Sequence, residues 1–231
     1  MKPMIGILAG MGPKSIAPFI DLVVEECQRQ YGARDDMDFP PMMIYSLPTP
    51  FTIDKPIDHG AMKRTIAQGL QKLASAGVAY IAMPCNTAHA YYTELAQAVD
   101  IPLLNIIEKT AGNLPDTPQK TTLFATASTL DTGLYQEAIR DKGHTFVFRD
   151  GRQDRINGII RSIKEGTDYA DAVSIWQSLL DEVSEASIDH VVNACTDLNV
   201  ISAQAPPKLP MIDSARCLAS AVVEKYMQLN Q

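Results

Sequence analysis

Hydrophobic positions along the chain alternate between two kinds of segment. Short, continuous apolar runs bounded by glycine or proline are typical of buried strands. Longer stretches repeat their apolar residues every three or four positions, as Met62, Ile66, Leu70 and Leu73 do, and a second helix of this kind is predicted around Trp176. Because strands and helices alternate, the sequence predicts an α/β fold with parallel sheets that carry helices on both faces.

The same order of segments occurs twice. Each copy opens on an apolar run and a loop of small residues, passes through two helical stretches and a second run, and reaches a third strand that ends in a cysteine. The expected strands are 4–8, 42–45, 78–83 and 102–105 in the first copy, and 121–124, 145–148, 189–193 and 210–213 in the second. The repeat predicts two similar lobes, although any α/β protein can show such a coincidence.

Cys85 and Cys195, separated by 110 positions, follow corresponding strands of the two copies. Ligands of parallel α/β folds bind at the carboxyl ends of strands, and polar residues stand there: Asn86 and Thr87 after the first cysteine and Thr196 after the second. If the lobes face each other about a pseudo-twofold axis, the thiols meet across a cleft. An ordinary thiol pKa of about 8.5 keeps both protonation states accessible. Such a pair suits proton removal from one face of a carbon and proton delivery to the other.

The α-hydrogen of an amino acid is weakly acidic, so a carbanion forms only if hydrogen bonds neutralise the neighbouring carboxylate. Suitable donors occur in the loop of the second copy, at Thr126, Ser128 and Thr129. The segment Gly10-Met11-Gly12 allows the backbone to approach a ligand closely. It lacks the third glycine and the acidic residue of a dinucleotide-binding motif, so we do not interpret it as one.

Composition narrows the functional classes. The chain has 231 residues, 46% of them hydrophobic, which suits one large domain or two small ones. Its formal charge of −7 and lack of a basic block argue against nucleic-acid binding. No apolar run approaches the roughly 18 residues of a membrane helix, and no signal-peptide cleavage site follows the first apolar stretch. We therefore expect a soluble, cytoplasmic protein with no nucleic-acid or membrane partner.

The remaining cysteines and the histidines point to structural roles. Cys27 and Cys217 lie in helical patterns without any CxxC pair, so we expect buried free thiols rather than disulfides. His89 follows Cys85 by four residues, but a zinc site needs three or four ligands and the other histidines lack the spacing. We expect no metal, and a structural or orienting role for His89.

The chain resembles the aspartate/glutamate racemase family of cofactor-independent amino-acid racemases over essentially its whole length. The resemblance is carried by the segments GILAGMGPKS, MPCNTAHA, ATAST and NACTDL. It implies two pseudo-symmetric lobes, each a parallel sheet flanked by helices, with the active site in the cleft between them. The expected lobes are residues 1–105 with 212–231, carrying Cys85, and residues 106–211, carrying Cys195. The resemblance also implies an amino-acid substrate, no cofactor and a homodimer.

The resemblance makes Cys85 and Cys195 the catalytic acid/base pair. The expected substrate contacts, from the resemblance and from the donors noted above, are Met11, Asn86, Thr87, Thr126, Ser128, Thr129, Lys164 and Thr196.

Several positions depart from the family pattern. Alanine replaces glycine at Ala9, Ala125 and Ala194, and Asp197 replaces a more frequent glutamate. These changes are conservative. Aspartate-specific relatives carry an arginine near 46–52, whereas this chain has no arginine between Arg34 and Arg64. The resemblance therefore implies aspartate, glutamate or a broader range of amino acids as the substrate, and the missing arginine favours glutamate or the broader range over aspartate alone.

Two other readings stay open. Related two-lobed enzymes include hydantoin racemases, maleate cis–trans isomerases and arylmalonate decarboxylases; in an isomerase, one cysteine would add to a double bond as a nucleophile. A non-catalytic amino-acid-binding relative is the third possibility, but a binding role does not require two thiols at corresponding positions.

Overall fold

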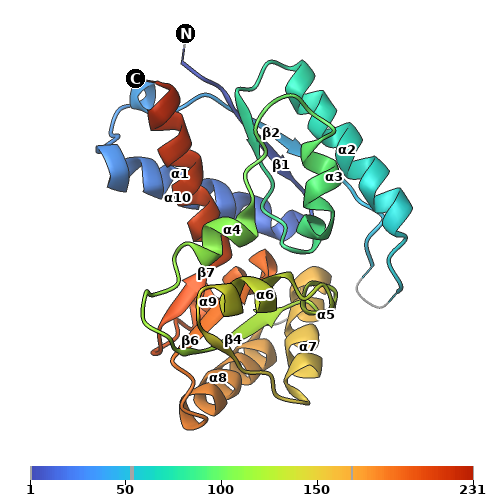
Figure 1. The fold of residues 1–231 in the computed structure, drawn as a ribbon, viewed down its shortest axis with the longest axis vertical. Helices are drawn as coiled ribbons and strands as arrows, with labels where there is room; N and C mark the ends of the chain where they lie inside the picture. The colour runs from blue at the N-terminus through green and yellow to red at the C-terminus, as the bar shows by residue number, and fades with distance from the viewer. Residues whose placement is uncertain (1, 53–54, 168, 231) are drawn as a thin grey trace. The chain divides into compact units, whose positions relative to one another are not determined.

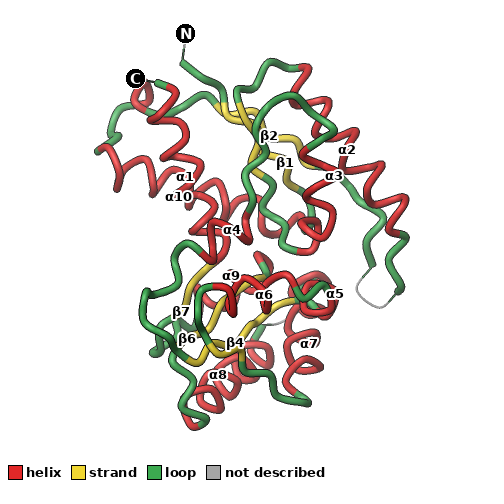
Figure 2. The backbone as a smooth tube through the Cα atoms, in the orientation of Figure 1, coloured by secondary structure: helices red, strands yellow, loops and turns green. Residues whose placement is uncertain are grey.

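A computed structural model gives the structure of the chain for residues 2–52, 55–167 and 169–230. The chain forms two compact units. Unit 1 comprises Met1–Ile106 and Ala215–Gln231, and unit 2 comprises Ile107–Ser214. Each unit contains a parallel sheet flanked by helices, which confirms the predicted α/β class (Figures 1 and 2).

In unit 1, strand β1 lies between β2 and β3. The strands are β1 (Ile5–Ala9), β2 (Met42–Ser46) and β3 (Tyr80–Ala82). The helices are α1 (Ile16–Tyr31), α2 (His59–Ser75), α3 (Tyr92–Ala96) and α10 (Ser214–Leu229), with 3-10 turns η1 (Pro13–Ser15), η2 (Asp36–Asp38) and η3 (Thr87–Tyr91). Helix α4 (Ile106–Ala111) and helix α10 begin where the chain passes between the units.

In unit 2, the strand order is β5-β4-β6-β7. The strands are β4 (Lys120–Ala125), β5 (Thr145–Phe146), β6 (His190–Ala194) and β7 (Met211–Asp213). The helices are α5 (Ala127–Asp131), α6 (Leu134–Asp141), α7 (Arg152–Glu165), α8 (Ala170–Glu185) and α9 (Asn199–Gln204), with the 3-10 turn η4 (Thr196–Leu198).

The strand order within each unit follows the repeat seen in the sequence. In both units the first strand lies between the second and the third, and all pairings are parallel. The fourth segment differs. In unit 1 it forms only an isolated bridge between Ile81 and Leu103, whereas in unit 2 it is the strand β7. Ile212 and Asp213 pair with β6, so the boundary between the units falls after Ser214 and not after residue 211.

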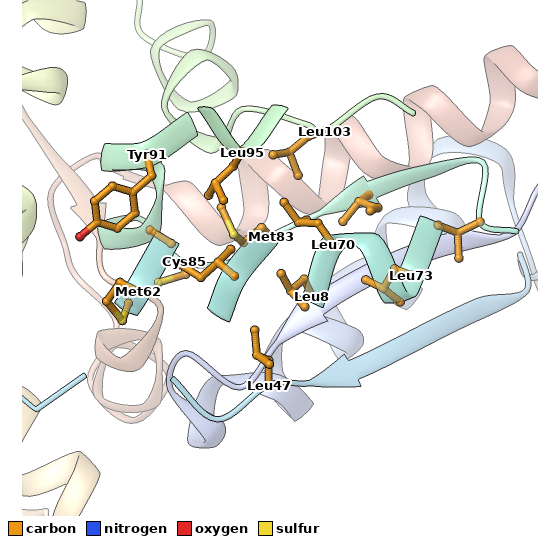
Figure 3. Close-up of a cluster of buried hydrophobic side chains, with 14 residues drawn as sticks. Leu8, Leu47, Met62, Leu70, Leu73, Met83, Cys85, Tyr91, Leu95 and Leu103 are labelled. Carbon is orange, nitrogen blue, oxygen red and sulfur yellow. The ribbon is translucent and has the colours of Figure 1, made fainter. Parts of the chain in front are cut away.

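The core of unit 1 lies between the sheet and α2. Leu8 of β1 and the helical series predicted from the sequence, which includes Ile66 and Leu70, belong to one buried cluster (Figure 3). Cys27 and Cys217 are buried thiols, as predicted. Over the three described ranges, no helix is long and apolar enough to cross a bilayer.

In unit 2, α7 and α8 are joined to the sheet by charge as well as by packing. The Glu182 carboxylate contacts the guanidinium groups of Arg149, Arg152 and Arg155 at 3.1, 3.0 and 2.7 Å. Arg152 is 4% exposed and also donates to the hydroxyl of Thr122 on β4. A buried cation is tolerated only when it is paired and hydrogen-bonded, so this cluster fixes the position at which α7 begins.

Candidate active site

Cys85 lies just beyond the carboxyl end of β3, at one end of the buried apolar cluster of unit 1. Its neighbours in this cluster include Met62, Met83 and Tyr91 (Figure 3). The residue is 9% exposed, and its backbone N–H donates to the carbonyl of Met83 at 2.8 Å. The tight backbone turn and the apolar packing fix where this thiol stands.

His89 holds the backbone of Cys85 from one turn further along the chain. The ring is 1% exposed; Nδ1 lies 2.8 Å from the Cys85 carbonyl oxygen, and Nε2 accepts the N–H of Ile106 at 3.1 Å. Nδ1 therefore carries the proton in this network, and burial lowers the pKa of His89. A neutral ring engaged on both sides suits the orienting role expected for it.

The loop after β1 lies next to Cys85, because β1 and β3 are neighbouring parallel strands. Gly10 has φ +95°, and a Cβ there would lie 2.7 Å from the backbone nitrogen of Leu47. Only glycine fits this close approach. Met11, at the tip of the loop, packs against the apolar cluster that contains Cys85.

Asn86 and Thr87 continue directly from Cys85 into the turn η3. Asn86 is 4% exposed, and its carbonyl accepts the His89 N–H at 3.0 Å. Unit 1 thus brings four of the expected site residues to the carboxyl ends of β1 and β3: Met11, Cys85, Asn86 and Thr87.

Cys195 occupies the corresponding place in unit 2, directly after β6 and at the start of η4. Burial, and then the negative charge of Asp197, raise the pKa of the Cys195 thiol to about 12. Three groups lower the pKa of this thiol. The backbone N–H groups of Asp197 and Leu198 donate hydrogen bonds to its sulfur, and Lys164 contributes its positive charge. The thiol is protonated at neutral pH, and donors that would stabilise its thiolate are in place.

Hydroxyl groups stand beside Cys195 at the same edge of the sheet. Ala125 of β4 pairs with Ala194 of β6, so the residues that follow, Thr126 and Cys195, occupy neighbouring positions. The Thr126 hydroxyl oxygen accepts the Thr129 N–H at 3.1 Å and lies 2.9 Å from the Thr129 hydroxyl. Ser128 lies in the same short helix, α5, and Thr196 begins η4.

Lys164 reaches this edge from the last turn of α7. Its Nζ forms an ion pair with Oδ2 of Asp197 at 3.0 Å. Asp197 was noted in the sequence only as a replacement for glutamate, and its pairing with Lys164 was not predicted. No local signal could have revealed it, because the two residues lie on different elements far apart in the chain.

Each unit therefore carries a buried thiol and hydrogen-bonding groups at the carboxyl ends of its first and third strands. This arrangement defines an α/β protein with a duplicated thiol site. Within the described part of the chain, no group of three or more His, Cys, Asp or Glu side chains could hold a metal ion.

The sequence profile of the Asp/Glu/Hydantoin racemase family matches residues 8–222, and the chain belongs to this family. It is 44% identical over 224 residues to the broad specificity amino-acid racemase RacX of Bacillus subtilis (strain 168), covering 97% of this chain and 98% of that protein.

Solved structures show the same fold. Aspartate racemase from Picrophilus torridus superposes with a TM-score of 0.83 at 28% identity, covering 97% of this chain and 94% of that one. An aspartate racemase homologue from Pyrococcus horikoshii OT3 gives a TM-score of 0.77 at 23% identity, over 98% and 100% of the two chains. At that identity the likeness establishes the fold alone.

Proposed function

We propose that this protein racemises amino acids without pyridoxal phosphate, using the thiols of Cys85 and Cys195 on opposite faces of the α-carbon. One observation carries the proposal: the two buried thiols follow corresponding strands, β3 and β6, in units with the same strand order. Family membership and the 44% identity to a racemase support it.

In this mechanism a thiolate on one side removes the α-proton, and the electron pair of the C–H bond is delocalised into the carboxylate. The thiol on the other side then protonates the carbon, which inverts it. Hydroxyl and amide groups next to the thiols, including Asn86, Thr87, Thr126 and Thr196, hydrogen-bond the carboxylate as its charge grows. Since burial keeps Cys195 protonated at neutral pH, Cys195 is a proton donor in the resting protein.

The raised pKa of Cys195 predicts a pH-dependent stability. In the unfolded chain the thiol ionises near its ordinary value of 9.0, while in the folded protein it holds its proton to about pH 12. Its contribution to stability is therefore complete below pH 9 and is lost as the pH rises from 9 towards 12. We expect the free energy of unfolding of the wild type, relative to Cys195→Ser, to fall by up to about 1.4 kcal/mol per pH unit in that window.

Urea denaturation of both proteins between pH 7.5 and 10.5 measures this difference. The difference between the unfolding free energies of the two proteins should be constant near pH 7.5 and should shrink as the pH approaches 10.5. Parallel pH profiles for the two proteins would show that the folded Cys195 thiol has an ordinary pKa.

The activity itself is tested in deuterated water. The purified protein, free of pyridoxal phosphate, is incubated with single enantiomers of the common amino acids, and chiral chromatography with mass spectrometry follows the products. The proposal predicts that the opposite enantiomer appears with deuterium on its α-carbon. Turnover of maleate without amino-acid exchange would instead support an isomerase, and tight amino-acid binding without exchange would support a binding protein.

We further propose a broad substrate range, a cytoplasmic location and a homodimer. The broad specificity of the Bacillus subtilis relative RacX and the lack of an arginine between Arg34 and Arg64 support the range. All four cysteines are thiols, which suits a reducing compartment. Strand β2 lies at the edge of its sheet and exposes the apolar side chains of Met43 and Ile44, and a second copy packed along this edge would cover both.

A further inference from the structure

We propose that Asp197 sets the substrate specificity by neutralising Lys164, so that the site prefers amino acids with uncharged side chains to aspartate and glutamate. This inference rests on the proposed racemase activity and names the substrate class of that same site.

The ion pair between Lys164 and Asp197 is short and largely shielded from water. The nitrogen and oxygen atoms lie 3.0 Å apart, and the side chains are 27% and 6% exposed. At such burial the two charges are weakly screened, and each strongly offsets the field of the other. A substrate carboxylate that approaches the Lys164 ammonium therefore also meets the negative charge of Asp197.

The pair lies within electrostatic range of the reacting carbon in the proposed mechanism. The backbone N–H of Asp197 bonds the Cys195 sulfur, and the charges of both Asp197 and Lys164 act on that thiol. Because the thiol reaches the α-carbon, a side chain attached to this carbon lies in the field of the pair. A field without net charge gives a carboxylate little advantage over an amide of the same shape.

A second feature of Asp197 favours uncharged side chains that can donate. Its other oxygen, Oδ1, is buried and accepts no hydrogen bond from any residue in the described ranges. A buried acceptor without a donor costs free energy, and a substrate amide would relieve that cost, whereas a carboxylate cannot donate. The sequence also supplies no arginine between Arg34 and Arg64 as an additional cation.

The test compares aspartate with asparagine, which differ in charge but hardly in shape. The measured quantity is the ratio of kcat/KM for aspartate to kcat/KM for asparagine. Asp197→Asn removes the negative charge that offsets Lys164 and should raise this ratio at least about tenfold. Lys164→Met leaves the Asp197 charge uncompensated and should lower the ratio, and the double variant should return it close to the wild-type value.

Asp197→Glu keeps the negative charge and serves as the matched control, with a ratio near that of the wild type. The ratio cancels any effect of a substitution on the reactivity of Cys195 that all substrates share. For a variant that turns over too slowly, the ratio of the two dissociation constants, measured by calorimetry, replaces it. Opposite shifts in the two single variants support the inference; unchanged ratios, or shifts in the same direction, overturn it. If the racemase proposal itself is wrong, the wild-type protein will exchange the α-hydrogen of no amino acid, and this result is distinct from an unchanged ratio.

Discussion

Replacement of either Cys85 or Cys195 by alanine is expected to lower the rate of racemisation by roughly 10²–10⁴-fold, the usual contribution of a positioned acid or base. In the proposed mechanism each thiol serves one face of the α-carbon, so the loss of either one blocks inversion in both directions. The rate is measured from the appearance of the opposite enantiomer by chiral chromatography.

Cys27→Ala is the matched control for these variants. Cys27 is also a buried free thiol, but it lies in α1 and is not among the expected site residues. We expect this variant to racemise at close to the wild-type rate. Full activity in Cys85→Ala or Cys195→Ala would contradict the two-thiol mechanism.

His89→Leu is expected to destabilise the protein by roughly 1–3 kcal/mol, since it removes two buried hydrogen bonds between the ring and backbone groups. These groups are the carbonyl of Cys85 and the N–H of Ile106, which the ring bonds at 2.8 and 3.1 Å. The same change frees the backbone of Cys85 and should lower kcat. Urea denaturation and steady-state kinetics measure the two effects.

Two conservative variants separate positioning of the thiol from general stability. An asparagine amide can take the place of Nδ1 and donate to the Cys85 carbonyl, whereas a glutamine amide reaches the place of Nε2. If the contact with Cys85 positions the thiol, His89→Asn should have a higher kcat than His89→Gln, even if the two variants differ in stability. Equal kcat values for the two variants would show that His89 stabilises the fold but does not position the Cys85 thiol.

The sequence predicted the features that depend on local periodicity and on the ends of strands. The spacing of Met62, Ile66 and Leu70 predicted a helix with one buried face, because a period of 3.6 residues is a property of the segment alone. The position of Cys85 after an apolar run predicted where its side chain would stand, because carboxyl ends of parallel strands meet at one edge.

Features that join distant segments were not predictable in this way. The ion pair of Lys164 with Asp197 depends on how α7 packs beside η4, which no periodicity encodes. The hydrogen bond from Ile106 to His89 likewise requires the chain after Leu103 to return beside the turn η3. Nor does any local pattern explain why the fourth segment of unit 1 forms only a single bridge while its counterpart in unit 2 is the strand β7.

The most direct test of the two-thiol claim follows deuterium exchange in each enantiomer separately, using the single-cysteine variants. With one thiol removed, the other can still exchange the α-hydrogen that faces it, without inversion. The two-thiol mechanism predicts that Cys85→Ala exchanges one enantiomer only and that Cys195→Ala exchanges only the other. Exchange of the same enantiomer by both variants, or of both enantiomers at equal rates by either, would contradict it.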